Sequence, residues 1–518
     1  MKTIIKSTYK IALTVMLIGL AAIGCKKDFL DRKNPNEITA GTFFETPDQV
    51  QQAVNTLYPA INSVRSIFEQ NSRGGDATLT SGAFDVQVAY FNFQSTPESG
   101  DTDGLWENIY SMIYRANTIL ANLDRADWSE DAELKERLRA ETLFFRGVGY
   151  FYLAHMFGQV PIITSLPETE EDYNPSKASS PDEVYDQAIA DLTEAKNGLP
   201  AEQEDVGRAT KGAATAFLGK TYLYRAGYLG QDEYKAKAAA EFREVMDLGI
   251  YDLVEKYEDN FTDANENNEE SIFEIQYGYN GGLGTPTQDR TFNMVPGISF
   301  EIFLRPSQWV MQTMATEKTI DGEYDPRYLQ TIYFDGGLPL FGVPYDELGD
   351  GISCNGGVGA GGAPDGSSSK DGGWWRKYLN VNYSCEPAIT TERGSENNER
   401  LMRYADVLLM YAEAVADTDP AAANAAIKQI RDRANLPVKA FSGAEIMEEI
   451  KHQRILEFTY ENMHYFDLIR WGLLGDALQD HGTAPQIQNY DPVKHKYFPI
   501  PTSEINNNTN LEQNDAWK

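Results

Sequence analysis

Residues 216–253, AFLGKTYLYRAGYLGQDEYKAKAAAEFREVMDLGIYDL, decide the fold. Small and aromatic side chains recur there on facing turns with a period of about 3.6 residues, which is the period of an α-helix. The pattern breaks once, near Gly230, and glycine commonly follows the last turn of a helix. The stretch therefore predicts two helices joined by a short turn.

A second stretch has the same layout. Residues 404–436, YADVLLMYAEAVADTDPAAANAAIKQIRDRANL, carry a similar mixture of small and apolar residues, and Pro420 is placed to begin the second helix. Both stretches resemble tetratricopeptide hairpins, whose helix pairs stack on one another. Two further stripes with helical spacing predict faces that pack on other helices. They consist of Ala140, Phe144, Gly147, Phe151 and Ala154, and of Leu401, Ala405, Leu408, Ala412 and Val415.

Local signals mark where other elements begin. A capping residue followed by proline predicts a helix start. Two starts carry this signal: Thr46, Pro47 and Gln49, and Ser180, Pro181 and Glu183. Residues 272–277 alternate as a strand does, and residues 335–385 are rich in loop-forming residues. We therefore expect a mostly α protein, a tetratricopeptide-like helical hairpin scaffold with long irregular loops and a few short strands.

The N-terminus has the pattern of a secretory leader. Three lysines precede an apolar run over residues 11–23, which is shorter than the span of about 20 residues that a transmembrane helix needs. Small residues lead up to Cys25, and AIGC resembles the lipobox of bacterial lipoproteins. We expect residues 1–24 to be a signal peptide, Cys25 to be lipidated and residues 25–518 to form one domain. Ordinary secretion is the alternative.

Charge narrows the class of partners. The chain has 78 acidic and 45 basic residues, a formal net charge of −33, and the leader contains lysines but no acid. A strongly anionic protein repels nucleic acid, so a nucleic-acid partner is not expected. Two cysteines follow Cys25. Outside the cytoplasm Cys354 and Cys385 could form a disulfide, or they could remain two free buried thiols.

Catalytic and metal motifs are not found in the sequence. The five histidines have no metal-ligand spacing, and residues 263–274 match a calcium loop only in part, so no metal or cofactor is expected. Glu457 and Glu461 could be the paired carboxylates of a glycosidase. However, Arg454 is three residues from Glu457, and Asp467 is three residues from Arg470. Such helical spacing predicts ion pairs, which lower carboxylate pKa values, so an enzyme is not expected.

A series of motifs resembles one family from end to end. They are CKKDFLD (25–31), TFFETPDQVQQAVNTLY (42–58), LWENIYSMIYRANTIL (105–120), LRPSQWVMQTM (304–314), YDPRY (324–328), QRILEFTYENMHYFDLIRWG (453–472) and YFPIPTSEINNN (497–508). The order and content are similar to the SusD/RagB family of outer-membrane nutrient-binding lipoproteins. The resemblance implies a lipid-anchored protein facing the exterior that binds oligosaccharides and delivers them to a TonB-dependent, SusC-like transporter. Peptide capture on the same fold, a surface glycosidase and a pure protein scaffold are the alternatives.

A neutral sugar offers an apolar face and a rim of hydroxyl groups, so its site should combine aromatic rings with planar polar groups. Two irregular regions contain both, and the family's aromatic platforms lie in equivalent regions. The candidate ligand-binding residues are Arg73, Asp76, Tyr90, Asn92 and Phe93, and Tyr277, Tyr279, Trp374, Trp375 and Arg376. We expect one of the adjacent Trp374 and Trp375 rings to pack inward and the other to be presented to the ligand; the alternative is that both anchor the Gly-rich loop. Trp106 and Trp309 have helical spacing and are expected in the core.

Overall fold

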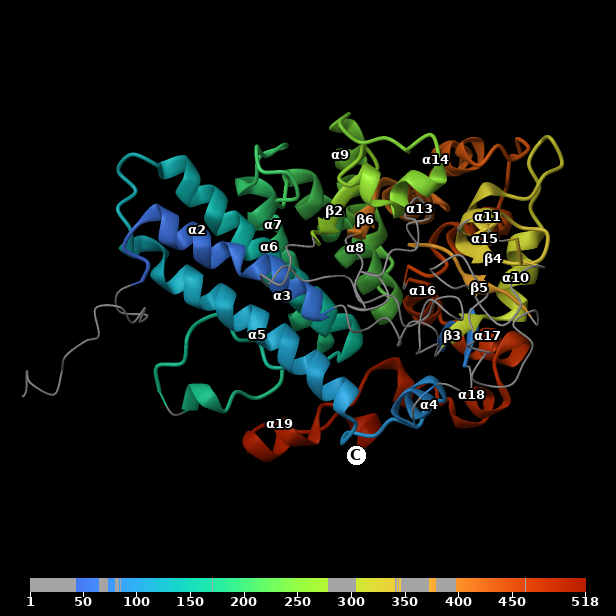
Figure 1. Cartoon of the computed structure of the whole chain (residues 1–518). Helices are drawn as coiled ribbons and strands as arrows, with labels where there is room; N and C mark the ends of the chain where they lie inside the picture. Colours follow the sequence, from blue (N-terminus) through green and yellow to red (C-terminus); the bar gives the residue numbers. More distant parts are fainter. Residues whose placement is uncertain are drawn as a thin grey trace, which may run out of the picture.

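The computed structural model describes residues 43–64, 73–79, 83, 85–169, 171–277, 304–340, 342, 344–345, 372–378, 397–461 and 463–518. The described part is mostly helical, as expected (Figure 1). Its helices are α2 (Pro47–Asn55), α3 (Leu57–Val64), α4 (Asp85–Phe91), α5 (Gly100–Asn122), α6 (Ala132–Met156), α7 (Pro181–Gly198), α8 (Lys211–Leu229), α9 (Glu233–Asp247), α10 (Gln308–Ala315), α11 (Pro326–Thr331), α13 (Tyr404–Val415), α14 (Pro420–Arg433), α15 (Ala444–Phe458), α16 (His464–Arg470), α17 (Leu474–His481), α18 (Ala484–Asn489) and α19 (Thr502–Asn507).

Both predicted hairpins are confirmed. Helix α8 is capped by Gly230, whose φ of 66° lies in the left-handed region that glycine adopts without strain. Helix α9 begins three residues later. Pro420 is the first residue of α14, directly after α13 and its turn. Helices α5 to α9 each pack on the next, and α9 then packs on α13, which packs on α14 (Figure 1). The hairpins therefore form one continuous stacked array.

The central helices are buried more completely than the sequence stripes predicted. Every residue of α13 is buried, and so is nearly all of α8. Helix α6 is buried on all faces from Ala140 onward, with Tyr152 half-buried. The predicted stripes are buried, except that Leu401 lies half-buried in strand β6 (Glu399–Arg403) and not on α13. The other faces of these helices are also buried, because each helix lies between neighbours on more than one side.

Two predicted helix starts differ in detail. Thr46 and Gln49 form the full capping box at α2, with the Thr46 hydroxyl accepting from the Gln49 backbone N–H at 3.3 Å. Ser180 and Pro181 do begin α7, but the Ser180 side chain makes no capping hydrogen bond. Instead the Glu183 carboxylate accepts from the Ser179 backbone N–H at 3.4 Å.

In the described part of the chain, three short two-stranded antiparallel sheets lie among the helices. They pair β1 (Ala77–Leu79) with β3 (Leu304–Pro306), β2 (Ser271–Ile275) with β6 (Glu399–Arg403), and β4 (Ile332–Tyr333) with β5 (Trp374–Trp375). The predicted strand is thus confirmed as β2. Both of its faces are buried, including Glu274, which pairs with Arg400 at 3.2 Å.

Within the described residues, the buried apolar side chains include a large core, a smaller core and a small cluster of Tyr257, Phe261 and Tyr378. The large core lies among the stacked helices. The smaller core lies where β1, β3, α10, α11, β4, β5 and α15 meet, and Figure 1 shows these last helices together at one end of the molecule. None of the helices in the described part of the chain has the combination of length and hydropathy that a membrane span requires.

Candidate functional site

The first predicted ligand region folds into an aromatic cage around Arg73. The guanidinium carbon of Arg73 lies 3.4 Å from the ring centroid of Tyr90 and 4.9 Å from that of Phe93. Tyr465 and Phe498 complete the cage at 6.0 Å and 5.8 Å. Arg73, Tyr90 and Phe93 are all buried, so the structure brings these predicted residues together as cation–π packing beneath the surface.

Asp76 and Asn92 lie beside this cage and connect it to later segments. The Asp76 carbonyl accepts from the Ser307 backbone N–H at 3.0 Å, which fixes β1 to the start of α10. Asp76 Oδ1 also lies 3.8 Å from His464 Nδ1. The Asn92 carbonyl accepts from the Asn489 amide at 3.0 Å. Both predicted residues are buried and tie together segments far apart in the sequence.

The second predicted region contains Trp374, Trp375 and Arg376. Trp375 pairs with Ile332 across the β4–β5 sheet, and its ring stacks on Tyr460 with centroids 4.6 Å apart. Both tryptophans are 2% exposed, so the expectation that one ring faces outward is wrong. Adjacent residues of a strand do face opposite ways, but here both sides of β5 are covered. The Arg376 guanidinium is also buried and donates to the Pro339 carbonyl at 2.8 Å.

Tyr277 lies apart from both regions, in the large core. Its hydroxyl donates to Asn62 Oδ1 at 2.5 Å, and its backbone N–H donates to Asn398 Oδ1 at 2.7 Å. Tyr279, Cys25, Cys354 and Cys385 lie outside the described residues. The structure therefore gathers five predicted ligand residues in one place, three in another, and places Tyr277 elsewhere.

Trp309 differs from its predicted place in the core. Trp106 is buried at 3% exposure, as predicted, but Trp309 is only half-buried. Its ring stacks on His481 with centroids 3.7 Å apart and an interplanar angle of 4°. Helix α10 directs Val310 and Met314 into the small core, which leaves Trp309 at the edge of that face. In the sequence, Trp309 comes one residue before Val310, so it is offset from the stripe of Val310 and Met314 that faces the core. This offset could have predicted that Trp309 is only half-buried.

Glu457 and Glu461, the two acids considered as a catalytic pair, belong to a buried ionic cluster. Glu457 accepts from Arg403 at 3.0 Å, from Arg433 at 2.6 Å and from Arg327 at 3.2 Å. Glu461 pairs with Arg403 at 2.8 Å and with Lys377 at 2.6 Å. The predicted ion pairing of both acids is confirmed, but Arg454 is not the partner of Glu457. Arg454 binds Asp467 and Asp406 instead.

The electrostatics of this cluster oppose acid catalysis. Burial alone would raise the pKa of the Glu457 carboxyl, but Arg433, Arg403 and Arg327 bring it well below its usual range. The pKa of Glu461 is also lowered, by Arg403 and Lys377 against the effect of burial. A general acid needs a raised pKa and access to substrate, and neither side chain has them.

Metal chemistry has little support in the described residues. Within them, no group of three or more His, Cys, Asp or Glu side chains could hold a metal ion. The partial calcium match at residues 263–274 ends in β2, and its last acid, Glu274, binds Arg400. Glu266 of that segment is half-buried, and burial raises the pKa of its carboxyl to about 7.

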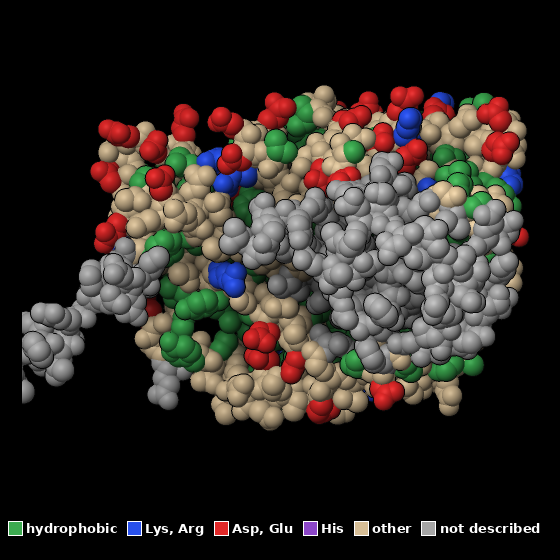
Figure 2. All heavy atoms as spheres, viewed as in Figure 1, with side chains coloured by type: hydrophobic (Ala, Val, Ile, Leu, Met, Phe, Trp, Pro, Cys, Tyr) green, Lys and Arg blue, Asp and Glu red, His purple; other side chains and the backbone are tan. Residues whose placement is uncertain are grey.

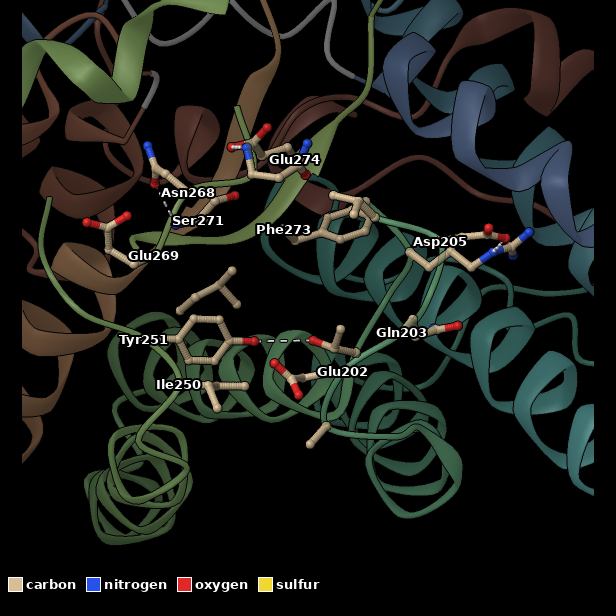
Figure 3. A pocket seen from close by; sticks show the side chains of 17 residues that line it. Glu202, Gln203, Asp205, Ile250, Tyr251, Asn268, Glu269, Ser271, Phe273 and Glu274 are labelled. Atoms are coloured by element: carbon tan, nitrogen blue, oxygen red, sulfur yellow. Dashed lines mark hydrogen bonds and ion pairs between the residues drawn. The ribbon is translucent and has the colours of Figure 1, made fainter. Parts of the chain in front are cut away.

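A separate cleft of about 270 Å³ opens beside the α8–α9 hairpin (Figure 3). Ile250, Tyr251 and Glu202 lie along one side of it, and Ser271, Phe273 and Glu274 of β2 lie along the other. None of these residues was predicted to bind a glycan; the one local motif among them is the partial calcium match that ends at Glu274. Figure 2 shows acidic side chains spread over the described part of one face, with few basic ones among them.

Comparisons with known proteins cover nearly the whole chain. Residues 252–517 match the SusD family, and residues 28–223 match a family described as starch-binding and associating with the outer membrane. Starch-binding protein SusD of Bacteroides thetaiotaomicron is 26% identical over 457 residues, covering 82% of this chain and 80% of that protein. A crystal structure of a SusD superfamily protein from Bacteroides vulgatus has a TM-score of 0.78 at 27% identity, covering 92% of this chain and 100% of the other. A laminarin-binding SusD-like protein has a TM-score of 0.71 at 25% identity, covering 91% and 99%.

Proposed function

Because the chain belongs to the SusD family, we propose that it is a glycan-binding lipoprotein of the outer membrane. It captures oligosaccharides outside the cell and passes them to a TonB-dependent, SusC-like transporter. Residues 1–24 are its signal peptide, lipidated Cys25 is its anchor, and residues 25–518 are its single binding domain. The observation that carries the proposal is the family match over both halves of the chain, to relatives named for starch and laminarin binding.

The ionic cluster supports binding without catalysis. Glu457 and Glu461 are the only acids that the sequence offered as a catalytic pair, and both are engaged by buried cations. A protein that hands its ligand on unchanged needs no such pair. The strongly negative charge further supports neutral glycans over uronates and sulfated sugars, because like charges repel.

We place the glycan on the side of the molecule built by β1, β3, α10 and α17. Trp309 is a half-buried aromatic ring there, held flat against His481. The predicted residues around Arg73 and Trp375 are buried beneath this surface and hold its strands in position. The aromatic cage around Arg73 holds β1, and the stack of Trp375 on Tyr460 holds β5. A rigid ring of this kind suits the C–H face of a pyranose.

Calorimetry on the mature chain tests the binding function. The protein would carry Cys25→Ser to prevent lipidation and would be titrated with maltoheptaose, laminarihexaose and short peptides. We expect a neutral oligosaccharide to bind and Trp309→Ala to weaken it at least tenfold, which is about 1.4 kcal/mol. Trp128→Ala is the matched control, because Trp128 is also half-buried but lies beyond α5 and donates to the Leu123 carbonyl.

Each contrary result has a defined meaning. Binding of peptides alone would favour the peptide-capturing alternative. Full glycan affinity in Trp309→Ala would move the site away from α10. Transport is tested separately, by mild detergent extraction of native outer membranes. If the lipidated protein repeatedly purified without a TonB-dependent transporter, the delivery step of the proposal would fail.

A further inference from the structure

The cleft of Figure 3 lies on the helical-hairpin side and is built from three separate segments. One is the connection between α7 and α8, the second follows α9, and the third is the turn that leads into β2. Figure 3 shows Glu269 at one end of the cleft and Asp205 at the other. The residues proposed above for glycan capture do not line it.

The aromatic ring in this cleft is held in one position. The hydroxyl groups of Tyr251 and Thr210 share a hydrogen bond of 3.2 Å. Thr210 in turn caps α8, with its hydroxyl accepting from the Ala213 backbone N–H at 3.2 Å. Gly212 makes room for the ring, because a Cβ at that position would overlap the Tyr251 hydroxyl. The half-buried ring is therefore a preorganised surface and not a mobile side chain.

Aliphatic groups lie beside the ring. Ile250 is 38% exposed and Val206 is 72% exposed, and both line the cleft. Together with Tyr251 they give it an apolar part, while carboxylate and hydroxyl groups make up much of the rest. A pyranose ring has the same division, with C–H groups on its faces and hydroxyl groups around its edge.

The amide and guanidinium groups that line the cleft already donate to acceptors of the protein. The Arg208 guanidinium donates to Asp205, Glu141 and Asn55. The Asn268 amide donates to the carbonyls of Asp259 and Asn265. The amide groups of Asn267 and Gln203 are bonded in the same way. A ligand that brings only acceptors, such as a carboxylate or a sulfate, would find few partners here.

Acceptors, in contrast, remain available. Glu202 and Glu269 are both exposed and line the cleft. Within the described part of the chain, neither carboxylate accepts a hydrogen bond or joins an ion pair. An occupant must therefore supply donors, and vicinal hydroxyl groups match carboxylate oxygens well.

We propose that this cleft binds a neutral pyranose unit, as a second glycan contact distinct from the surface at Trp309. The inference rests on the proposed function, because it assumes that the protein meets neutral glycans. A second contact on one chain raises the effective concentration of a long glycan at the first. It also excludes uronic acids, whose carboxylates would face Glu202 and Glu269.

Binding in this cleft can be measured by methyl NMR, as a chemical-shift change of the Ile250 methyl signal. The full mature chain with Cys25→Ser would be labelled at isoleucine δ1 methyl groups, and the Ile250 signal assigned by its loss in Ile250→Val. Titrants would be maltoheptaose, laminarihexaose, mannohexaose and xylohexaose, with trigalacturonate and a lysine-rich peptide for comparison. Every titration would be repeated in Trp309→Ala, and calorimetry would record total binding in parallel.

We expect a neutral oligosaccharide to shift the Ile250 signal in both wild type and Trp309→Ala. The double variant Glu202→Gln, Glu269→Gln should weaken that response at least fivefold, while Glu130→Gln, an exposed acid before α6, should leave it unchanged. Heat from glycan binding without any Ile250 shift would overturn the inference and leave the proposed function standing. A shift that disappears in Trp309→Ala, or that only the lysine-rich peptide produces, would also overturn it. Absence of both heat and shift with every glycan would refute the proposed function itself.

Discussion

Replacing Glu457 by glutamine should destabilise the protein strongly. Neither the wild type nor this variant should cleave a glycan. The side chain of Glu457 is 0% exposed and forms ion pairs with Arg327, Arg403 and Arg433. Four acids balance four cations in this cluster: Asp325, Glu270, Glu457 and Glu461, and Arg327, Arg403, Arg433 and Lys377. Glu457→Gln keeps the shape but leaves one buried positive charge without compensation.

Removing one member of a buried ion pair costs about 3–5 kcal/mol of unfolding free energy. With an unfolding entropy of about 2.1 cal/mol/K per residue, a loss of about 4 kcal/mol lowers the melting temperature of a chain of this length by about 4 °C. Urea denaturation and differential scanning calorimetry would measure the two quantities. The matched control is Glu194→Gln, because the exposed Glu194–Arg139 pair should contribute less than about 1 kcal/mol.

Charge balance gives this prediction a second test. The double variant Arg433→Gln, Glu457→Gln restores neutrality and should cost less than the sum of the two single variants. The pH dependence has a definite sign, because the folded-state pKa of Glu457 is lowered. Its contribution is present above the ordinary carboxyl pKa and is lost as pH falls, so wild type and Glu457→Gln should converge in acid. A loss below about 1 kcal/mol at neutral pH would refute the argument.

Four further predictions concern other buried or half-buried groups. Burial raises the pKa of the Glu266 carboxyl from 4.5 to about 7, so the free energy of unfolding falls as pH rises from 4.5 to 7. Glu266→Gln lacks this titration, so in urea titrations it should gain stability over wild type across that pH range. Burial lowers the His155 pKa to about 3 from 6.5, so stability falls as pH drops below 6.5, and His155→Phe should flatten that slope by up to about 1.4 kcal/mol per pH unit. Arg73→Lys removes the flat stacking of the guanidinium on Tyr90 and should lower the free energy of unfolding by about 1 kcal/mol, measured by urea denaturation. An unchanged free energy of unfolding would show that the cage does not stabilise the fold. Trp375→Ala should cost about 3–5 kcal/mol, and an unchanged melting temperature would contradict its buried stacking.

Sequence alone determined the helical scaffold, because its signals are local. The hairpin at residues 216–253, the proline that begins α14 and the capping box at Thr46 all appear where the patterns indicated. Each rests on hydrogen bonds and sterics among residues within one or two turns. The Asp467–Arg470 ion pair was predictable for the same reason, since the two residues lie three apart on one helix.

Tertiary structure decided which side chains meet and which are exposed. Arg327 reaches Glu457 across 130 residues of sequence, and no local pattern could have named it in place of Arg454. Likewise, Trp374 and Trp375 are both buried and Trp309 is only half-buried, although the sequence context suggested one exposed ring in the Trp374–Trp375 pair and a buried Trp309. Exposure depends on every segment that packs against a residue, and those segments come from β1, α10, α15 and α17, which are distant in the chain. The Tyr251 cleft likewise exists only because three separated loops meet beside the α8–α9 hairpin.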